Sequence, residues 1–273
     1  MKLGFVTCVQ LGLSCMEAIY DAGGKLQVAI TLKDEKAKSK SGRVFLDKFC
    51  QSKSIELVKI DHINDDNVID VIKKYDLDWL FIIGWSQIAK KRLLDTPKLG
   101  VLGMHPTLLP KGRGRASIPW AIIKGLDETG VTLFKLDEGV DTGAILSQHK
   151  IPLNDSTTST ELYQLVSDAH SNLMKSIIPN ILSGNVNLQE QDNAAATVWE
   201  GRTPKDGEID LKDSIVNAER LVRATTKPYP GAFVMREGKK YIIWKAQVVK
   251  KYTDGLCLEF KDGFLECLEW EVE

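Results

Sequence analysis

The stretch Asp78-Trp79-Leu80-Phe81-Ile82-Ile83-Gly84 decides the fold class of this chain. A run of consecutive apolar residues that ends at a glycine is typical of a strand buried on both faces, as strands of parallel sheets are. A second apolar segment follows after a short interval, over residues 99–104. Together the two segments predict neighbouring strands in the middle of an α/β sheet.

The first 150 residues repeat this pattern of short apolar runs separated by helical periodicity. Strands are expected over 3–8, 26–32 and 55–60, and helices over 14–22, 43–51, 65–74 and 118–124. The alternation predicts βαβ units and hence a Rossmann-like, mainly parallel sheet. Two more strands, over 131–136 and 144–153, have little helix between them, which favours an antiparallel addition at one edge.

The remainder of the chain predicts a second, smaller domain. A long amphipathic helix is expected over 158–182, because Thr158 and Glu161 fit a capping box and apolar residues follow at helical spacing. A polar, turn-rich stretch comes next, and then a helix and four short strands, expected over 214–225, 233–235, 240–249, 256–260 and 264–270. We predict a catalytic domain over 1–190, a linker over 191–205 and a β-rich, OB-like domain over 206–273.

Composition restricts the class of protein. The chain has 273 residues, with 36 lysines and arginines against 37 aspartates and glutamates, and 43% of it is hydrophobic. This balance argues against a strongly basic nucleic-acid binder and against disorder. No apolar run approaches the roughly 18–20 residues of a membrane span, and the N-terminus lacks a signal-peptide pattern. The five cysteines form no CxxC pair and the four histidines are widely spaced. We expect a cytoplasmic protein with reduced thiols, no membrane partner and no metal.

Two strand ends carry residues suited to chemistry. The chain lacks GxGxxG after its first strand and lacks GxxxxGK[ST], which disfavours a dinucleotide or nucleoside-triphosphate enzyme. Ligands of open α/β sheets bind beyond the carboxyl ends of strands. Residues 84–88 and 103–115 follow two central strands. The second segment holds His105, either a structural histidine or a catalytic one, and three cations that form either a solvated loop or a phosphate site: Lys111, Arg113 and Arg115.

Four motifs, in order, resemble one enzyme family. They are His105-Pro106-Thr107-Leu108-Leu109-Pro110, Gly114-Arg115-Ala116, Thr129-Gly130-Val131-Thr132 and Asp137-Glu138-Gly139-Val140-Asp141-Thr142-Gly143-Ala144-Ile145. This set resembles the N10-formyltetrahydrofolate-dependent formyltransferases, strongly over residues 75–153. Residues 202–207 and 228–233 resemble, more weakly, the C-terminal domain of the tRNA and sugar members. The resemblance implies a formyltransferase fold and N10-formyltetrahydrofolate as co-substrate, with no metal.

The resemblance also implies catalytic roles for a histidine and an aspartate. His105 would stabilise the tetrahedral oxyanion or move the amine proton, and Asp141 would orient the imidazole or hold a relay water. The family usually has asparagine two residues before the histidine, where this chain has Gly103. Loss of such a donor typically costs on the order of 10²–10³ in rate. The candidates to replace it are Gln87, Ser86 and Thr107.

The family's folate pocket corresponds here to two loops, residues 85–93 and 139–141. The resemblance implies that folate contacts come from Trp85, Ile88, Leu93, Leu102, Gly139, Val140 and Asp141. Ordinary packing in the core is the alternative for Ile88, Leu93 and Leu102.

The acceptor amine is the open question. Residues 206–273 contain 11 lysines and arginines against 13 aspartates and glutamates, a net charge of −2, whereas a tRNA ligand requires basic surface. We therefore expect a nucleotide-linked amino sugar, as in nucleotide-sugar N-formyltransferases that make glycan precursors, with a pseudaminic-acid-pathway enzyme as one subtype. Lys111, Arg113 and Arg115 would bind the pyrophosphate. Methionyl-tRNA formyltransferase and a catalytically impaired folate-binding homologue are the alternatives. Apolar positions in the small domain could supply a homodimer interface.

Overall fold

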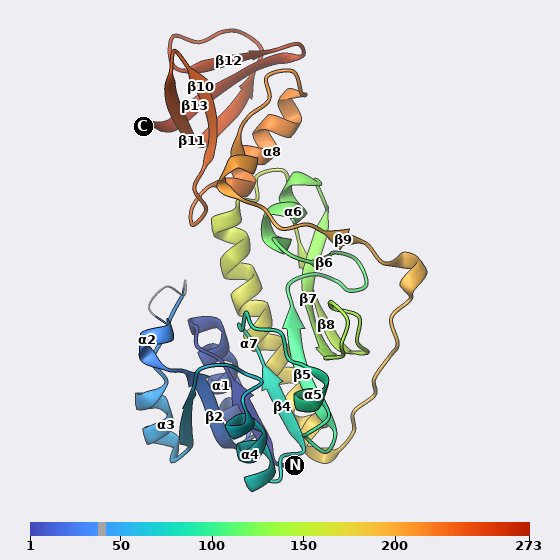
Figure 1. The fold of residues 1–273 in the computed structure, drawn as a ribbon. Coiled ribbons are helices and arrows are strands. Elements are labelled where there is room, and N and C mark those ends of the chain that lie inside the picture. Colours follow the sequence, from blue (N-terminus) through green and yellow to red (C-terminus); the bar gives the residue numbers. More distant parts are fainter. Residues whose placement is uncertain (38–41) are drawn as a thin grey trace. The chain divides into compact units, whose positions relative to one another are not determined.

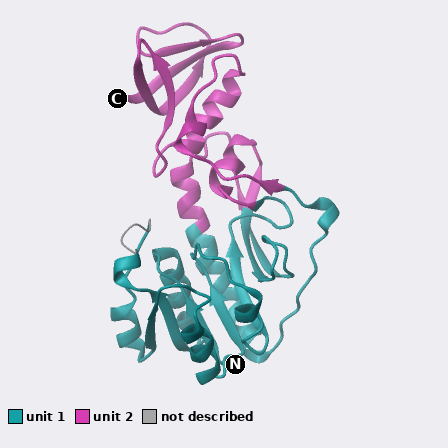
Figure 2. Ribbon diagram, viewed as in Figure 1, with its two compact units in different colours: residues 1–113, 130–150, 167–197 teal, residues 114–129, 151–166, 198–273 magenta. Residues whose placement is uncertain are grey.

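The structure, a computed structural model, describes residues 1–37 and 42–273. It divides into two compact units, each built from several chain segments (Figure 2). Unit 1 comprises Met1–Arg113, Gly130–Lys150 and Ser167–Thr197. Unit 2 comprises Gly114–Thr129, Ile151–Val166 and Val198–Glu273. The small C-terminal domain expected from the sequence therefore lies within unit 2, which also contains two segments from the first 190 residues.

A seven-stranded sheet organises unit 1, in the order β3-β2-β1-β4-β5-β7-β8 (Figure 1). Its strands are β1 (Leu3–Val6), β2 (Leu26–Leu32), β3 (Glu56–Ile60), β4 (Trp79–Ile82), β5 (Gly100–His105), β7 (Glu128–Lys135) and β8 (Ile145–Pro152). The pairs from β3 through β5 are parallel, and β7 runs antiparallel to β5. The predicted Rossmann-like, mainly parallel sheet with antiparallel strand addition is confirmed.

The strand order reverses at β1, because the chain winds first toward β3 and then returns to β4 and β5. The carboxyl ends of these strands share one edge, which is where ligands of such sheets bind. One face of the sheet buries Val6, Leu80 and Val101 against apolar residues of α4 (Asp66–Lys74) and α5 (Lys91–Leu94). Apolar packing therefore fixes β4 and β5, and with them the loops after their last residues.

The remaining helices of unit 1 are α1 (Gln10–Asp21), α2 (Asp34–Ala37), α3 (Asp47–Lys53) and most of α7 (Ser159–Ser183). The helix expected over 43–51 is wrong at its start. The guanidinium of Arg43 donates to the carbonyl oxygens of Cys8 and Leu32 and to Thr31 Oγ1, at 3.2–3.4 Å. These contacts hold residue 43 in a loop, so helix α3 begins only at Asp47.

Helix α7 is 25 residues long and runs through both units. The predicted capping box is present, since Glu161 Oε2 accepts from Thr158 N at 2.8 Å and Thr158 Oγ1 accepts from Glu161 N at 3.3 Å. The helix has a proline, Pro179, in its interior. Within the described residues, no helix has both the length and the apolar character that crossing a membrane requires.

Unit 2 carries a four-stranded antiparallel sheet in the order β10-β11-β13-β12. Its strands are β10 (Ala232–Arg236), β11 (Lys239–Val249), β12 (Cys257–Phe260) and β13 (Gly263–Val272). Helix α8 (Ile215–Thr225) packs on this sheet through Ala218 and Val222, beside Ile243 and Leu265. The expected β-rich domain is confirmed. The short elements of unit 2 are α6 (Ser117–Ile123), β9 (Val198–Trp199) and the 3₁₀ turn η2 (Pro204–Gly207). Strand β6 (Arg113–Gly114), which pairs with β9, begins at the last residue of a unit 1 segment, and the 3₁₀ turn η1 (Asn193–Ala195) belongs to unit 1.

Candidate active site

His105 is the last residue of β5 and lies at the edge of the sheet where its parallel strands end. The residue is only 7% exposed. Its Nε2 lies 2.8 Å from the carbonyl oxygen of Gly112, and its Nδ1 lies 3.5 Å from Asp141 Oδ2. A carbonyl oxygen can only accept, so Nε2 carries a hydrogen. Nδ1 is therefore the nitrogen that gains a proton when the imidazole becomes cationic, and it faces the carboxylate.

Asp141 reaches the imidazole from the loop between β7 and β8. Its backbone has φ of +55°, a left-handed conformation that is uncommon for a residue with a side chain. The loop is held from within, because Asp137 Oδ1 accepts from Gly139 N at 3.0 Å and from Thr142 Oγ1 at 2.7 Å. The structure thus brings together the histidine and the aspartate that the sequence paired across 36 positions of chain.

A buried amide connects the two loops of this pair. Gln191 is 8% exposed, and its Nε2 donates to the carbonyl oxygens of Asp141 at 2.8 Å and Gly143 at 2.7 Å. Its Oε1 accepts from Nε and Nη2 of Arg113, at 3.1 and 2.8 Å. Gln191 lies in the expected linker and was not predicted as a site residue, because its partners are 50 and 78 residues away in the sequence.

A second network holds the loop that follows His105. Thr132 Oγ1 donates to the carbonyl oxygen of Thr107 at 2.6 Å and accepts from Leu109 N at 3.1 Å. Gln148 Nε2 donates to both Thr132 Oγ1 and the carbonyl oxygen of Leu109, at 2.9 and 2.8 Å. Strands β7 and β8 therefore fix the path of residues 107–109.

Leu136 occupies the space where a side chain at position 103 would lie. A Cβ atom added to Gly103 would come within 2.6 Å of Leu136 Cδ2. Gly103 sits in β5 between Ile82 of β4 and Phe134 of β7, so its backbone is held on both sides. In this chain, therefore, the Leu136 side chain fills the space that the family's asparagine side chain would need at position 103.

The three predicted replacement donors differ in what they contact. Both polar atoms of the Gln87 amide are bonded within the protein. Its Oε1 accepts from Ile63 N at 2.8 Å, and its Nε2 donates to the carbonyl oxygen of Asp61 at 3.2 Å. This placement disfavours Gln87 as the replacement donor. Ser86 is exposed. Thr107 is buried, and its Oγ1 has no hydrogen-bond partner among the described residues.

The predicted folate residues separate into core and surface. Leu93 and Leu102 are fully buried in the core of unit 1, which favours the alternative of ordinary packing. Ile88 and Val140 are 80% and 64% exposed, which is unusual for apolar side chains this large. Trp85 is half-buried with its indole Nε1 buried and unpaired among described residues, and Gly139 is exposed.

The three predicted phosphate-binding cations have different surroundings. Arg113 is 7% exposed and donates to Gln191 and, at 2.8 Å, to Asn193 Oδ1. A guanidinium enclosed in this way is a structural element, because solvent-borne phosphate does not reach it. Lys111 and Arg115 are exposed, and the Arg115 side chain lies alongside Gly201. A sequence shows charge but not burial, which is why the three looked equivalent.

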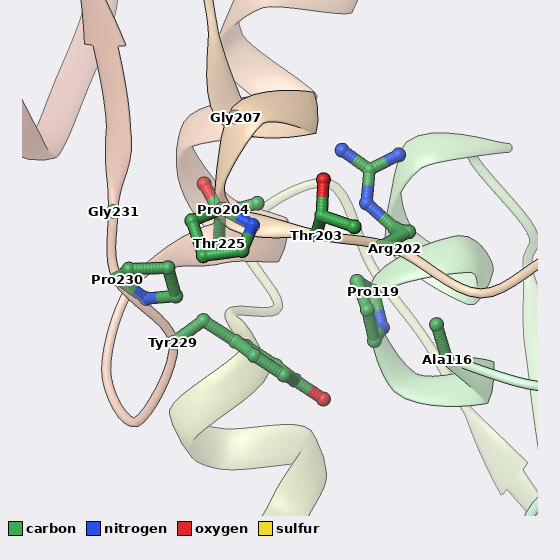
Figure 3. A pocket seen from close by; sticks show the side chains of 10 residues that line it. All are labelled: Ala116, Pro119, Arg202, Thr203, Pro204, Gly207, Thr225, Tyr229, Pro230 and Gly231. Carbon is green, nitrogen blue, oxygen red and sulfur yellow. The ribbon is translucent and has the colours of Figure 1, made fainter.

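Unit 2 holds a small pocket of about 140 Å³ (Figure 3). It is lined mainly by apolar groups, with Tyr229 and Arg202 as its large polar side chains. The Arg202 guanidinium lies 4.8 Å from the ring centre of Trp120, and burial lowers its pKa. Burial also raises the pKa of Tyr229, whose hydroxyl lies 3.5 Å from that of Tyr163. The pocket lacks an acid–base pair, and no group of three metal-ligating residues occurs in the described part of the chain.

Comparison with known proteins decides the family. The formyl transferase domain profile matches residues 19–178, and the profile of the formyl transferase C-terminal domain matches residues 202–265. The chain belongs to the formyltransferase family. The first profile contains Gly103, His105 and Asp141, and the second contains most of the residues that line the unit 2 pocket.

Relatives of this formyltransferase differ in name and length. It is 34% identical to the bifunctional polymyxin resistance protein ArnA of Wigglesworthia glossinidia brevipalpis, over 96% of this chain but 40% of the relative. It is 31% identical to a methionyl-tRNA formyltransferase of Agathobacter rectalis, over 93% of this chain and 82% of the relative. A solved N-formyltransferase from Helicobacter canadensis, in complex with folinic acid and dTDP-3-aminofucose, superposes with a TM-score of 0.72 at 19% identity, over 100% of this chain and 98% of that one.

Proposed function

We propose that this chain transfers a formyl group from N10-formyltetrahydrofolate to the amine of a nucleotide-linked amino sugar. The observation that carries the proposal is the His105–Asp141 contact of 3.5 Å at the carboxyl end of β5, in a chain of the formyltransferase family. An imidazole that faces a carboxylate can accept a proton at neutral pH and hold the resulting positive charge.

In the proposed formyl transfer, His105, Asp141 and the Gly112 carbonyl each have a distinct role. The neutral amine of the acceptor attacks the formyl carbon, and a carbon–nitrogen bond forms as the carbonyl oxygen becomes an oxyanion. The amine proton passes to Nδ1 of His105, whose cationic form Asp141 stabilises. The bond to N10 of the folate then breaks, and the proton leaves with tetrahydrofolate. The Gly112 carbonyl keeps the ring in one orientation through Nε2.

The folate contacts that we propose come from the surface of unit 1. Ile88 and Val140 each expose most of a large apolar side chain, and Asp141 neighbours Val140 in the same loop. Apolar side chains around a few polar groups are the usual composition of a cofactor site.

Charge supports a compact acceptor. The stretch 206–273 has a net charge of −2, which is unfavourable for contacts to many phosphates. The solved neighbour from Helicobacter canadensis is a complex with dTDP-3-aminofucose, and that ligand supports an amino sugar linked to a nucleotide. Exposed Lys111 and Arg115 are the cations of the predicted cluster that can meet a pyrophosphate.

Methionyl-tRNA formyltransferase is the second candidate function. It is favoured by relatives of that name that this chain matches over most of their length, 84% of one and 82% of another. The two functions differ in how acceptor binding depends on salt. Binding of tRNA weakens steeply as salt rises, because each neutralised phosphate releases counterions.

An acceptor screen tests the proposal. The wild-type protein is incubated with N10-formyltetrahydrofolate and a panel of UDP-, dTDP- and GDP-linked amino sugars plus charged initiator tRNA, and tetrahydrofolate release is measured. We expect release with a nucleotide sugar and its loss in His105→Ala and Asp141→Ala. His149→Ala is the control, since that histidine is exposed on β8. Turnover with tRNA alone would support the second candidate, and turnover that survives both catalytic substitutions would overturn the assignment of the site.

A further inference from the structure

We propose that Gln191 and Arg113 are positioning residues that set the distance between His105 and Asp141. The inference rests on the proposed formyl transfer for its functional meaning, but its geometric basis is independent of the acceptor. The observed bonds reach the two loops through their backbone: Gln191 Nε2 donates to the carbonyl oxygens of Asp141 and Gly143, and Arg113 donates to Gln191.

The Gln191 amide uses all of its hydrogen-bonding groups on these loops. Its two N–H groups go to the carbonyl oxygens of Asp141 and Gly143, on either side of Thr142. Its oxygen accepts twice from Arg113. The first two bonds fix the backbone from which the Asp141 carboxylate projects, where the chain is already in a left-handed conformation.

Arg113 restrains the imidazole of His105 through the backbone of Gly112. It directly follows Gly112, whose carbonyl oxygen lies 2.8 Å from His105 Nε2. The backbone here is also fixed by Thr197, which accepts from Gly112 N through Oγ1 and from Arg113 N through its carbonyl oxygen, both at 2.9 Å. Displacement of Arg113 would therefore move the acceptor that orients the ring, while displacement of Gln191 would move the carboxylate.

The chemistry of the pair argues against a purely structural role. Arg113 is a buried cation, and none of the ion pairs found in the described residues includes it. Burial of a charge among neutral acceptors is costly, and apolar side chains of similar volume would pack the same space at lower cost. Charge-assisted bonds to an amide oxygen give a stiff, directional link instead, which suits a group that must hold two loops in register.

The test is Gln191→Glu. A carboxylate at 191 still accepts from Arg113, so the buried cation stays paired, and this charge-assisted pair offsets part of the stability lost at the two carbonyl oxygens. The carboxylate has no hydrogens for the carbonyl oxygens of Asp141 and Gly143 and repels them. A misplacement of about 1 Å typically costs on the order of 10²-fold in rate, so we expect kcat to fall by about that factor while KM for the acceptor, to which we assign no contact in this loop, is unchanged.

Asn193→Ala is the matched control. Asn193 also accepts from Arg113, at 2.8 Å, but has no observed bond to the Asp141 loop, so kcat should stay within a few-fold of wild type. If Gln191→Glu does not fold, the double variant Arg113→Met/Gln191→Met keeps packing with apolar chains and is expected to show the same loss of kcat.

The outcomes separate the two proposals. Gln191→Glu with wild-type kcat, or with a loss confined to KM, overturns the positioning role. A loss of kcat in Asn193→Ala as large as that in Gln191→Glu overturns the role of Gln191, because the effect would then follow Arg113 alone. If wild type transfers no formyl group to any acceptor, the proposed function fails instead. The positioning role is then read from amide hydrogen exchange over residues 139–144, which should accelerate in Gln191→Glu and not in Asn193→Ala.

Discussion

Restoring a polar side chain at position 103 is expected to require the removal of Leu136. The Gly103→Asn substitution places a Cβ 2.6 Å from Leu136 Cδ2, well inside van der Waals contact. Gly103 is paired on both sides within the sheet, so its backbone cannot shift to relieve the overlap. The leucine side chain must move, and we expect Gly103→Asn alone to lose about 1–3 kcal/mol of stability.

The double variant Gly103→Asn/Leu136→Ala opens the space that asparagine needs. Leu136 is half-buried, so Leu136→Ala alone should cost about 2 kcal/mol, at the low end for leucine truncation. If the overlap is the cause of the first loss, the double variant is no less stable than Leu136→Ala. The two substitutions would then couple by about 1–3 kcal/mol, because their sites are in contact.

Urea denaturation of the four proteins measures this coupling, and formyl transfer measured in parallel reports on the site. An asparagine donor at the oxyanion is worth on the order of 10²–10³ in kcat, so the double variant should turn over faster than Leu136→Ala. Additive stability losses would refute the steric reasoning. Unchanged turnover in a folded double variant would show that position 103 does not face the oxyanion in this protein.

Three further predictions concern the stability of variants with single substitutions. Thr107→Val should raise the free energy of unfolding by about 1 kcal/mol, because it removes a buried hydroxyl without a partner in the described chain; a loss of stability in urea would reveal a hidden partner. Burial raises the pKa of the Cys15 thiol from 9.0 to about 12, so above pH 9 the unfolded chain loses this proton first and the folded state loses stability up to about pH 12. The stability advantage of wild type over Cys15→Ala should therefore shrink by about 1.4 kcal/mol between pH 8 and pH 10 in reducing buffer, and a constant difference would contradict this. Gly143→Ala brings a Cβ to 1.7 Å from the Lys135 carbonyl oxygen and should cost at least ~1–3 kcal/mol, whereas Gly255→Ala meets no atom within 4 Å and should be neutral; equal thermal midpoints would disprove the close approach.

Periodicity predicted the sheet because its strands are buried on both faces. Runs such as Trp79–Ile82 are apolar without interruption, and a parallel sheet is the structure that requires this. Periodicity did not predict the short helices α2 and α5. Each has four residues, and a single helical turn is too short for apolar residues to recur at helical spacing. The start of α3 was misplaced because Arg43 makes contacts with residues that are distant in sequence.

Only those residues of the candidate site that lie in a family motif could be predicted from the sequence. His105 and Asp141 were found together because their order and spacing match a family. Gln191 left no signal of that kind, since a glutamine in a polar stretch looks solvated until the fold encloses it. Arg113 was predicted to bind phosphate for the same reason. Its neighbours Lys111 and Arg115 are exposed, and charge alone does not distinguish the enclosed cation from the other two.

The interleaving of segments in unit 2 limits how the polypeptide can be dissected. Residues Gly114–Thr129 and Ile151–Val166 belong to that unit although they precede its sheet by many residues, and Ser159–Val166 is the beginning of the same α7 that continues in unit 1. A fragment cut at residue 190 would carry these pieces away from α8 and leave apolar surface bare on both products. Neither half is then a good candidate for separate expression, and chimeras with other formyltransferases that exchange only the C-terminal third would separate α8 from the α6 that it contacts.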